Sequence, residues 1–374
     1  MKRGWTTGLG IALLGAGCAL SPDPAKRNPN HLADVAPLRS AGAIEVVIEL
    51  PRPPGNLAVA ADGTVFFTFH PEADPDVHVA RYRPGDATYT LFPDDAWQHE
   101  RDDAPYFVTP LAVRIDAQGW VWVLDHGDYG SEPVSLSAFD PESGALLHRH
   151  VFSDDVAEWG SMLNDFVIDD AHRAIYIADP SPFEFDPAIV VYDLATETAR
   201  RVLENHDSVL SVDHHVVVQG RFMKAFGLPL QIDVDSIALS PGGLELYYGP
   251  LAGPTLYRIP TVVLRDERLN AGAVEAFVEV YGPKPTTDGI VCGPGGNVFL
   301  TAVEEDALAV LDAEGRLSVL ARDPELLAWA DGVSVSADGA WLYASVSELH
   351  RAIGRDPETL SEHAPFRIVR VPLR

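Results

Sequence analysis

The chain has 374 residues, 47% of them hydrophobic, and a formal charge of −28 at pH 7. A surface this acidic repels nucleic acid and anionic lipid, which excludes proteins that bind phosphate backbones. A solvated surface alone explains this negative charge. The charge would also favour binding of a cationic ligand or a metal ion. The 30 Gly and 30 Pro residues suit a fold made of many short strands and turns.

The first residues predict an export signal rather than part of the fold. Lys2 and Arg3 precede an apolar stretch, GLGIALLGAG, that ends before Cys18. The stretch is shorter than the ~20 residues of a transmembrane helix. We expect residues 1–18 to be a lipoprotein signal with a lipid on Cys18, the alternative being ordinary cleavage nearby. The protein would then be exported, at the periplasmic or outer face of the outer membrane or secreted, and would meet the membrane only through its lipid. Residues 19–42 read as a flexible tether.

A short pattern recurs along the rest of the chain. Each copy has a polar residue, an apolar strand, a tight turn, and a second strand rich in aromatic and β-branched residues. The copies are NLAVAADGTVFFTF from Asn56, AVRIDAQGWVWVL from Ala112, NDFVIDDAHRAIYIA from Asn164, DSIALSPGGLELYYG from Asp235, DGIVCGPGGNVFLTA from Asp288 and DGVSVSADGAWLYAS from Asp331. A period near 50 residues with hairpins inside each unit is the signature of a β-propeller. The sequence therefore predicts an all-β fold, a six-bladed β-propeller over residues 43–374, which we expect to be a monomer.

Each blade should contain four antiparallel strands, but the sixth copy supplies only three. The strand IEVVIEL (44–50) precedes the first blade and alternates correctly. It can pair with FRIVRVPL near the C-terminus and close the ring, which buries both open edges. The outer strand of the fourth blade is predicted in VEAFVEVY (274–281). Two insertions, 205–234 and 346–365, break the period and are expected to be loops with a short helix.

The starts of the innermost strands should ring one mouth of the channel. Five of the six positions there are Asn or Asp, and the sixth is Ala112. Carboxylate and amide oxygens suit a hard cation such as Ca²⁺, and buried carboxylates so close together repel one another without one. We predict a divalent cation, Ca²⁺ first, on Asn164, Asp235 and Asp288, with Asn56 and Asp331 as ligand-binding residues. The alternative is that Asx residues cap the strand starts by bonding the backbone.

Loops between the second and third strands reach the same mouth. Imidazoles titrate near neutral pH, so three His residues there are candidate acids or bases, and three acidic residues are candidate ligand contacts. The candidate catalytic residues are His70, His126 and His350, and the candidate ligand contacts are Asp125, Asp179 and Glu304. The alternative for each histidine taken alone, and the commoner case, is a hydrogen-bonding loop residue. Cys292 lies in an inner strand and reads as a small buried residue.

Other catalytic signatures are missing from the sequence. There is no G-x-S-x-G elbow, no phosphate-binding glycine loop, no HExxH and no dinucleotide fingerprint. The sequence gives no support to serine hydrolysis, kinase chemistry or zincin proteolysis, and we expect no nucleotide cofactor.

Several strings resemble the yellow/major royal jelly protein family. They are PLAVRIDAQGWVWVLDHG, LNDFVIDDAHRAIYIADPS, AIVVYDLAT, DSIALSPGGLELYYGPLAGPTLYRIPT and DGIVCGPGGNVFLTAV. The resemblance implies an exported six-bladed propeller with a small-molecule site in its central channel. Insect members are linked to pigment chemistry or to binding of biogenic amines, but this chain lacks their disulfide cysteines. A looser resemblance to gluconolactonases implies a divalent ion on the axis.

Three functions remain open at this point. In the first, a metal ion polarises the carbonyl of a small molecule and a His or carboxylate moves a proton, giving lactone-type hydrolysis or tautomerisation. In the second, the same acidic mouth captures an amine without turnover. In the third, the blade edges and insertions serve as a scaffold for other envelope proteins.

Overall fold

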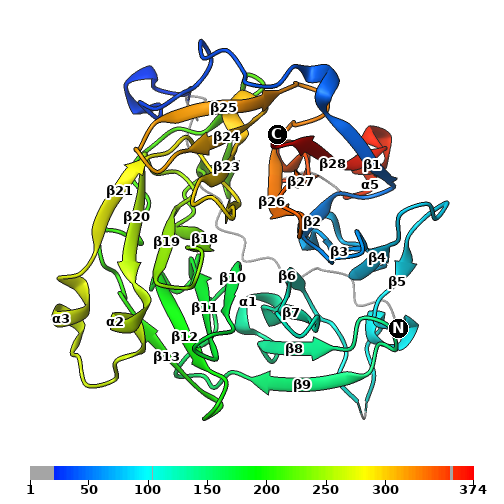
Figure 1. Ribbon diagram of the computed structural model, residues 1–374, viewed down its shortest axis with the longest axis vertical. Helices are drawn as coiled ribbons and strands as arrows, with labels where there is room; N and C mark the ends of the chain where they lie inside the picture. Colours follow the sequence, from blue (N-terminus) through cyan, green and yellow to red (C-terminus); the bar gives the residue numbers. More distant parts are fainter. Residues whose placement is uncertain (1–20, 103, 354–356) are drawn as a thin grey trace, which may run out of the picture.

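Six four-stranded antiparallel sheets surround a common axis in the computed structural model, which describes residues 21–102, 104–353 and 357–374 (Figure 1). Strands such as β2, β6, β10, β18 and β26 lie nearest the middle, and β9, β13, β21 and β25 lie at the rim. The prediction of a six-bladed β-propeller is confirmed.

The first three blades follow one another along the chain. Blade 1 contains β2 (Pro54–Val59), β3 (Val65–Phe69), β4 (Val79–Tyr82) and β5 (Thr90–Leu91). Blade 2 contains β6 (Pro110–Ile115), β7 (Val121–Asp125), β8 (Ser135–Phe139) and β9 (Leu146–Val151), with the short α1 (Gly127–Gly130) after β7. Blade 3 contains β10 (Phe166–Asp169), β11 (Ala174–Asp179), β12 (Ala188–Asp193) and β13 (Thr198–Val202).

The remaining blades complete the ring. Blade 4 contains β18 (Val234–Leu239), β19 (Glu245–Pro250), β20 (Thr255–Pro260) and β21 (Glu279–Pro283), with α2 (Thr261–Arg265) and α3 (Ala271–Glu275) before β21. Blade 5 contains β22 (Ile290–Cys292), β23 (Val298–Ala302), β24 (Ala307–Leu311) and β25 (Leu317–Arg322). Blade 6 contains β26 (Ala330–Val335), β27 (Trp341–Val346), β28 (Phe366–Pro372) and β1 (Glu45–Leu50).

The ring closes through the strand that comes first in the chain. β1 pairs antiparallel with β28, with Leu50 opposite Phe366 and Ile48 opposite Ile368. These four residues share one hydrophobic cluster with blade 1 residues such as Phe67. The predicted closure is confirmed, and its apolar side chains join the last blade to the first.

Two local predictions are wrong. The predicted outer strand 274–281 of blade 4 starts later, at Glu279, because residues 271–275 form α3, whose N-cap Asn270 accepts from the Ala273 amide. The insertion 205–234 contains two hairpins rather than loops. They are β14 (Val217–Val218) with β15 (Arg221–Phe222), and β16 (Lys224–Ala225) with β17 (Leu228–Pro229).

The second insertion contains short helices, as expected. They are α4 (Leu349–Ala352), α5 (Pro357–Leu360) and the 3-10 turn η6 (Ser361–His363). Within the described ranges, no helix has the length and apolar character that crossing a bilayer requires.

The described part of the expected tether lies along blade 5. The amides of Leu38 and Arg39 donate to carbonyls of β25, at Val319 and Leu320. Leu32 is 4% exposed and packs in the blade 5 cluster. The sequence did not anticipate these contacts, because the segment has no strand periodicity.

Shortening one closing side chain should weaken the whole fold. Leu50 is 1% exposed, so Leu50→Ala should lower the free energy of unfolding by about 2–5 kcal/mol through lost burial and a cavity. Chemical denaturation measures this. Val46→Ala on the same strand, where the side chain is 44% exposed, is the control and should change stability by less than about 0.5 kcal/mol. Equal effects of the two variants would contradict closure by β1.

Candidate functional site

The ring residues sit in irregular starts of the inner strands. The register of the inner strand shifts at its start in blades 1, 2, 4 and 6. Such bulges re-aim side chains. The freed backbone amides find hydroxyl partners on the second strand: Asn56 donates to Thr68, and Gly332 donates to Ser345 at 2.9 Å. The bulges satisfy the backbone while turning polar side chains toward the axis.

Two glycines allow neighbouring inner strands to approach. A Cβ on Gly289 would lie 2.2 Å from the carbonyl oxygen of Asp331, and one on Gly332 would lie 2.8 Å from the Cα of Asn56. Any larger residue would push these blades apart. The recurrent Asp-Gly pair therefore combines a polar group with the glycine that lets it reach its neighbours.

The polar side chains contact one another around the axis. The side-chain N–H of Asn56 donates to Asp165 Oδ1 at 2.5 Å, and the side-chain oxygen of Asn56 accepts a hydrogen bond from the Arg114 guanidinium. The same guanidinium lies 3.4 Å from Asp165 Oδ1. The Asn164 amide donates to Asp235 Oδ1. The carboxyl groups of Asp235 and Asp288 are within hydrogen-bonding reach of each other.

Burial and mutual repulsion raise the pKa values of these acids. Burial is the largest cause, and it raises the pKa of Asp288 to about 6. The pKa of Asp235 is raised well above its usual range, first by burial and then by Asp288, and that of Asp331 is raised by burial and the same neighbour. No donor among the described residues reaches Asp235 Oδ2 or Asp331 Oδ2. The cluster favours protons or a positive ligand.

Sequence reasoning missed four residues of this cluster. Asp165 adjoins the predicted Asn164, and Arg114 stands two residues beyond Ala112, on the same strand face. Trp329 donates its indole N–H to Asp288 at 2.7 Å. Lys284 is fully buried, and burial lowers its pKa to about 7 although Asp235 and Asp288 oppose the shift. Its ammonium donates to the carbonyls of Leu251 and Pro285.

One of the three candidate histidines, His70, lies at the cluster, and His126 lies near His70. Burial lowers the pKa of His70 to about 3, with a contribution from nearby His126, and that of His126 to about 4. Both are neutral at pH 7. Each Nδ1 accepts a backbone N–H, from Glu72 and Tyr129 respectively, so the proton of each ring is on Nε2. His70 Nε2 lies 3.9 Å from Asp331 Oδ2.

A hydrophobic cap covers the expected open mouth. Residues of both insertions pack over Trp329 together with loop residues of blades 1, 4 and 5. The cluster comprises Ala73, Val216, Val218, Met223, Leu230, Leu251, Ala252, Val303, Trp329, Leu349, Ala352 and Leu360. Below it, Asp235 is 3% exposed and Asp331 and His70 are 7% exposed. The acidic residues thus form a buried cluster under the cap rather than an open mouth, because the insertions supply apolar side chains that the channel ring lacks; we call this cluster the acidic chamber.

Other candidate residues lie outside the ring. Asp125 accepts the amides of Val108, Thr109 and Gly127, and Asp179 is held by Ser161, Met162, Ser181 and Arg201. Glu304 accepts from Arg27, Val217 and Thr286. These carboxylates fasten loops where each second strand ends.

His350 and the two cysteines complete the predicted set. His350 is buried in the cap beside Arg221, whose guanidinium donates to its carbonyl oxygen. It is separate from the ring, because α4 carries it into the second insertion. Cys292 is a partly buried free thiol whose pKa burial raises to about 11, and Cys18 lies outside the described residues.

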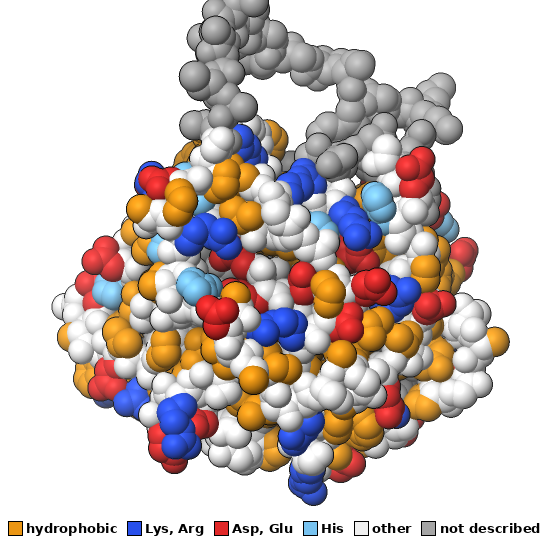
Figure 2. Space-filling model, turned by 90° about the horizontal axis from the view of Figure 1, so that it is seen from above, with side chains coloured by type: hydrophobic (Ala, Val, Ile, Leu, Met, Phe, Trp, Pro, Cys, Tyr) orange, Lys and Arg blue, Asp and Glu red, His pale blue; other side chains and the backbone are white. Residues whose placement is uncertain are grey.

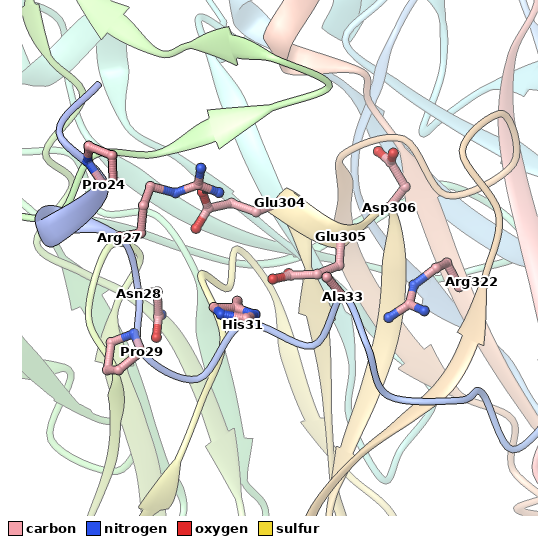
Figure 3. Close-up of a pocket in the computed structure, with 10 residues that line it drawn as sticks. All are labelled: Pro24, Arg27, Asn28, Pro29, His31, Ala33, Glu304, Glu305, Asp306 and Arg322. Atoms are coloured by element: carbon pink, nitrogen blue, oxygen red, sulfur yellow. Dashed lines mark hydrogen bonds and ion pairs between the residues drawn. The ribbon is translucent and has the colours of Figure 1, made fainter. Parts of the chain in front are cut away.

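A separate hollow lies beneath the N-terminal segment. It has a volume of about 660 Å³; Glu304 bonds directly to Arg27 on one side of it, Glu305 points toward His31, and Asp306 lies on the side of Arg322 (Figure 3). Figure 2 views the molecule from above and shows acidic side chains recessed among basic ones. Burial, with repulsion from Glu304, raises the pKa of Glu305 to about 7. Glu304 accepts hydrogen bonds from Arg27 of this segment and from the amide of Val217 beside the cap, so the hollow lies between the N-terminal segment and the cap.

The fold and the chamber define a capped six-bladed propeller with a buried acidic centre. Residues 108–373 match the profile described as major royal jelly protein, and the chain belongs to this family. The resemblance drawn from the sequence is confirmed.

Curated relatives at low identity agree with this assignment. Major royal jelly protein 5 of Apis mellifera is 25% identical over 49% of this chain and 31% of its own length. Protein yellow of Drosophila erecta is 23% identical over 62% of this chain and 45% of its own. The chain thus spans a third to about half of these two curated relatives.

Solved propellers share the fold at low identity. A gluconolactonase from Xanthomonas campestris has a TM-score of 0.57 at 16% identity, covering 97% of this chain and 99% of its own. The calcium-binding protein regucalcin from Agrobacterium tumefaciens has a TM-score of 0.58 at 16% identity, covering 90% and 95%. At this identity the likeness concerns the fold.

Removing one ring charge should stabilise the cation-free protein at high pH. The pKa of Asp288 is about 6 in the folded protein and about 4 in the unfolded chain, so ionising this carboxyl costs the folded state free energy. The cost is absent below about pH 4 and grows as pH rises through about 6. Asp288→Asn should therefore gain on the order of 1–3 kcal/mol above pH 7 and almost nothing at pH 4. Unfolding followed across pH in the presence of a chelator checks this. Asp154→Asn, at an exposed site, is the control, and a pH-independent gain would contradict the repulsion.

Proposed function

We propose that this chain is an exported, monomeric protein that binds a small molecule in the capped acidic chamber with the help of a cation. The observation that carries the proposal is the Asp235–Asp288 carboxyl pair, in which Asp235 is buried, Asp288 is half-buried, and Asp235 Oδ2 has no donor among the described residues. An orphaned carboxylate oxygen beside a second carboxyl group costs free energy unless a positive group or a proton joins them.

The residues fit a divalent cation in chemistry. Asp235 and Asp288 offer carboxylate oxygens, and Asn164 contacts Asp235. Among the described residues no three His, Cys, Asp or Glu side chains are grouped to hold a metal, so the Asn164 amide oxygen would have to complete the set. Oxygen donors of this kind suit Ca²⁺, and the fold likeness to a calcium-binding propeller agrees with that choice. Bound there, the ion would supply Lewis acidity toward a carbonyl oxygen.

The protein groups supply the remaining chemistry. His70 is neutral and carries its proton on Nε2, so it donates a hydrogen bond to a ligand oxygen rather than accepting a proton from one. Asp331, whose pKa is raised, can hold a proton or take one, and it lies beside His70. We therefore assign proton transfer to Asp331. The reaction class would be lactone hydrolysis or tautomerisation, and the cap would exclude bulk water.

Capture of an organic amine is the second candidate. The same carboxylates could receive an ammonium group, and the Trp329 indole bonded to Asp288 lines that side of the chamber. An ammonium needs counter-charge but no third oxygen ligand, which accords with the limited metal set. In this case nothing would be turned over.

Calcium titration of the chelator-treated full chain tests the cation. We expect one site per chain by calorimetry, with Asp288→Asn weakening it at least about tenfold because a ligand charge is lost. Asp154→Asn should bind like the parent protein. Absence of binding by Ca²⁺, Mg²⁺, Mn²⁺ and Zn²⁺, together with saturable binding of dopamine, would replace metal chemistry with amine capture.

Turnover of small lactones tests catalysis. Where the parent protein hydrolyses a lactone, Asp331→Asn should lower kcat by about 10²–10⁴-fold because the proton carrier is lost. Its Ca²⁺ affinity should change by less than about threefold, since Asp331 is outside the proposed ligand set. Full activity in Asp331→Asn would remove the assigned role.

A further inference from the structure

Apolar side chains are exposed beside the cap, outside the acidic chamber. Trp159 is 61% exposed, Phe226 is 88% exposed and Leu228 is 67% exposed. The Phe183 ring lies 6.4 Å from that of Trp159 and 5.9 Å from that of Phe226, between ring centroids. Phe185, on the same loop as Phe183, is 77% exposed. We call these five residues the aromatic tip. They join the loop before blade 3, the β11–β12 loop and the β16–β17 hairpin, and exposed apolar groups gathered in this way mark interaction surfaces.

The hairpin places an aromatic residue where its backbone disfavours one. Ala225 pairs with Leu228, so Phe226 and Gly227 form a two-residue turn, and both have positive φ, 51° and 82°. Turns of this kind favour Asn-Gly. A Phe that is exposed and held in a left-handed conformation costs local stability. The side chain at this position is better explained by what it contacts than by the turn.

The N-terminal end of the described chain lies on the same insertion. The Asp23 amide donates to His215 Nδ1 at 2.8 Å, and the Lys26 ammonium lies 2.5 Å from Asp213. Cys18 precedes Asp23 by five residues, which span at most about 18 Å when extended. The chain that follows Cys18 is therefore tied to the insertion that also carries the β16–β17 hairpin.

We propose that the aromatic tip rests in the interfacial layer of a bilayer and acts as a second membrane contact beside the lipid of Cys18. This proposal rests on the export signal and is independent of the channel ligand. A lipoprotein lipid carries more than one acyl chain and anchors a protein by itself, so the tip would orient the propeller against the bilayer rather than supply the anchor. Trp and Phe side chains suit the interface between headgroups and acyl chains.

Charge around the tip selects the lipid. Glu158 and Glu184 flank Trp159 and Phe185 in the sequence and are exposed. They oppose a strongly anionic surface, so the tip fits a zwitterionic bilayer. Added anionic lipid should weaken the contact at low salt, and screening by salt should restore it.

The test uses the full chain, produced with its own leader and reconstituted into phosphatidylcholine vesicles with brominated acyl chains. Tryptophan fluorescence is compared with that of Trp159→Phe, so that the difference reports Trp159. We expect bromine to quench this difference signal. Phe226→Asn with Leu228→Ser should reduce the quenching at least about twofold, because two apolar groups no longer enter the bilayer. Phe226→Asn also suits the turn, so folding should be retained.

The control removes exposed apolar groups elsewhere. Phe277→Asn with Val280→Ser, at positions 47% and 68% exposed near the outer edge of blade 4, should leave the quenching unchanged. An unquenched Trp159 signal overturns the proposal, as does quenching equal in the tip variant and the parent. Protection of Trp159 from a water-soluble quencher only after another protein is added also overturns it and assigns the tip to a protein partner. Protein that is recovered without a lipid and does not associate with these vesicles overturns it as well.

Discussion

The close approach of neighbouring inner strands is the constraint on which the centre of this protein depends. Because Gly289 and Gly332 have no side chain, the backbones of blades 5, 6 and 1 come together where each inner strand begins. The polar residues beside them must then share a small volume around the axis. Four carboxyl groups, those of Asp165, Asp235, Asp288 and Asp331, face only the guanidinium of Arg114 and the ammonium of Lys284 as nearby cations in the described chamber. The raised pKa values follow from burial in this geometry.

The cap covers the crowded acidic residues and separates them from solvent on that side of the ring. The insertion 205–234 contributes apolar side chains to the underside, where Val216, Val218 and Met223 pack with Trp329. Trp329 in turn bonds to Asp288, so the cap and the ring are one hydrogen bond apart. A ligand that enters from this side must separate that cluster. Entry is therefore governed by the packing of the cap as much as by the charge of the ring.

The sequence carried the repeat, and with it the fold, the closing strand and the ring positions, because each depends on a pattern that every blade shares. The sequence did not predict the features that occur in one blade only, because a repeat pattern carries no information about them. The position of Arg114 is apolar in every other copy, and that of Asp165 is apolar, Ser or Gly. The cap hairpins are too short for a periodic signal. Asp125 and Asp179 stand at strand ends, where ligand-binding residues are often found. Only the backbone N–H groups that they accept show that they stabilise loops. The protonated nitrogen of His70 likewise depends on a contact, the Glu72 amide.

The chamber is polarised, and this decides where a positive group can bind. Arg114 contacts Asn56 and Asp165, which neutralises the side formed by blades 1 to 3. Lys284 directs its ammonium to two backbone carbonyls, so it only partly offsets the acids near it. The uncompensated negative charge thus lies on the side of blades 4 to 6. His70 Nε2–H lies at the border of this side, 3.9 Å from Asp331 Oδ2. A ligand with a positive or metal-bound end and a neutral oxygen matches that polarity, whereas an anion would meet carboxylates at the point where Asp235 lacks a donor.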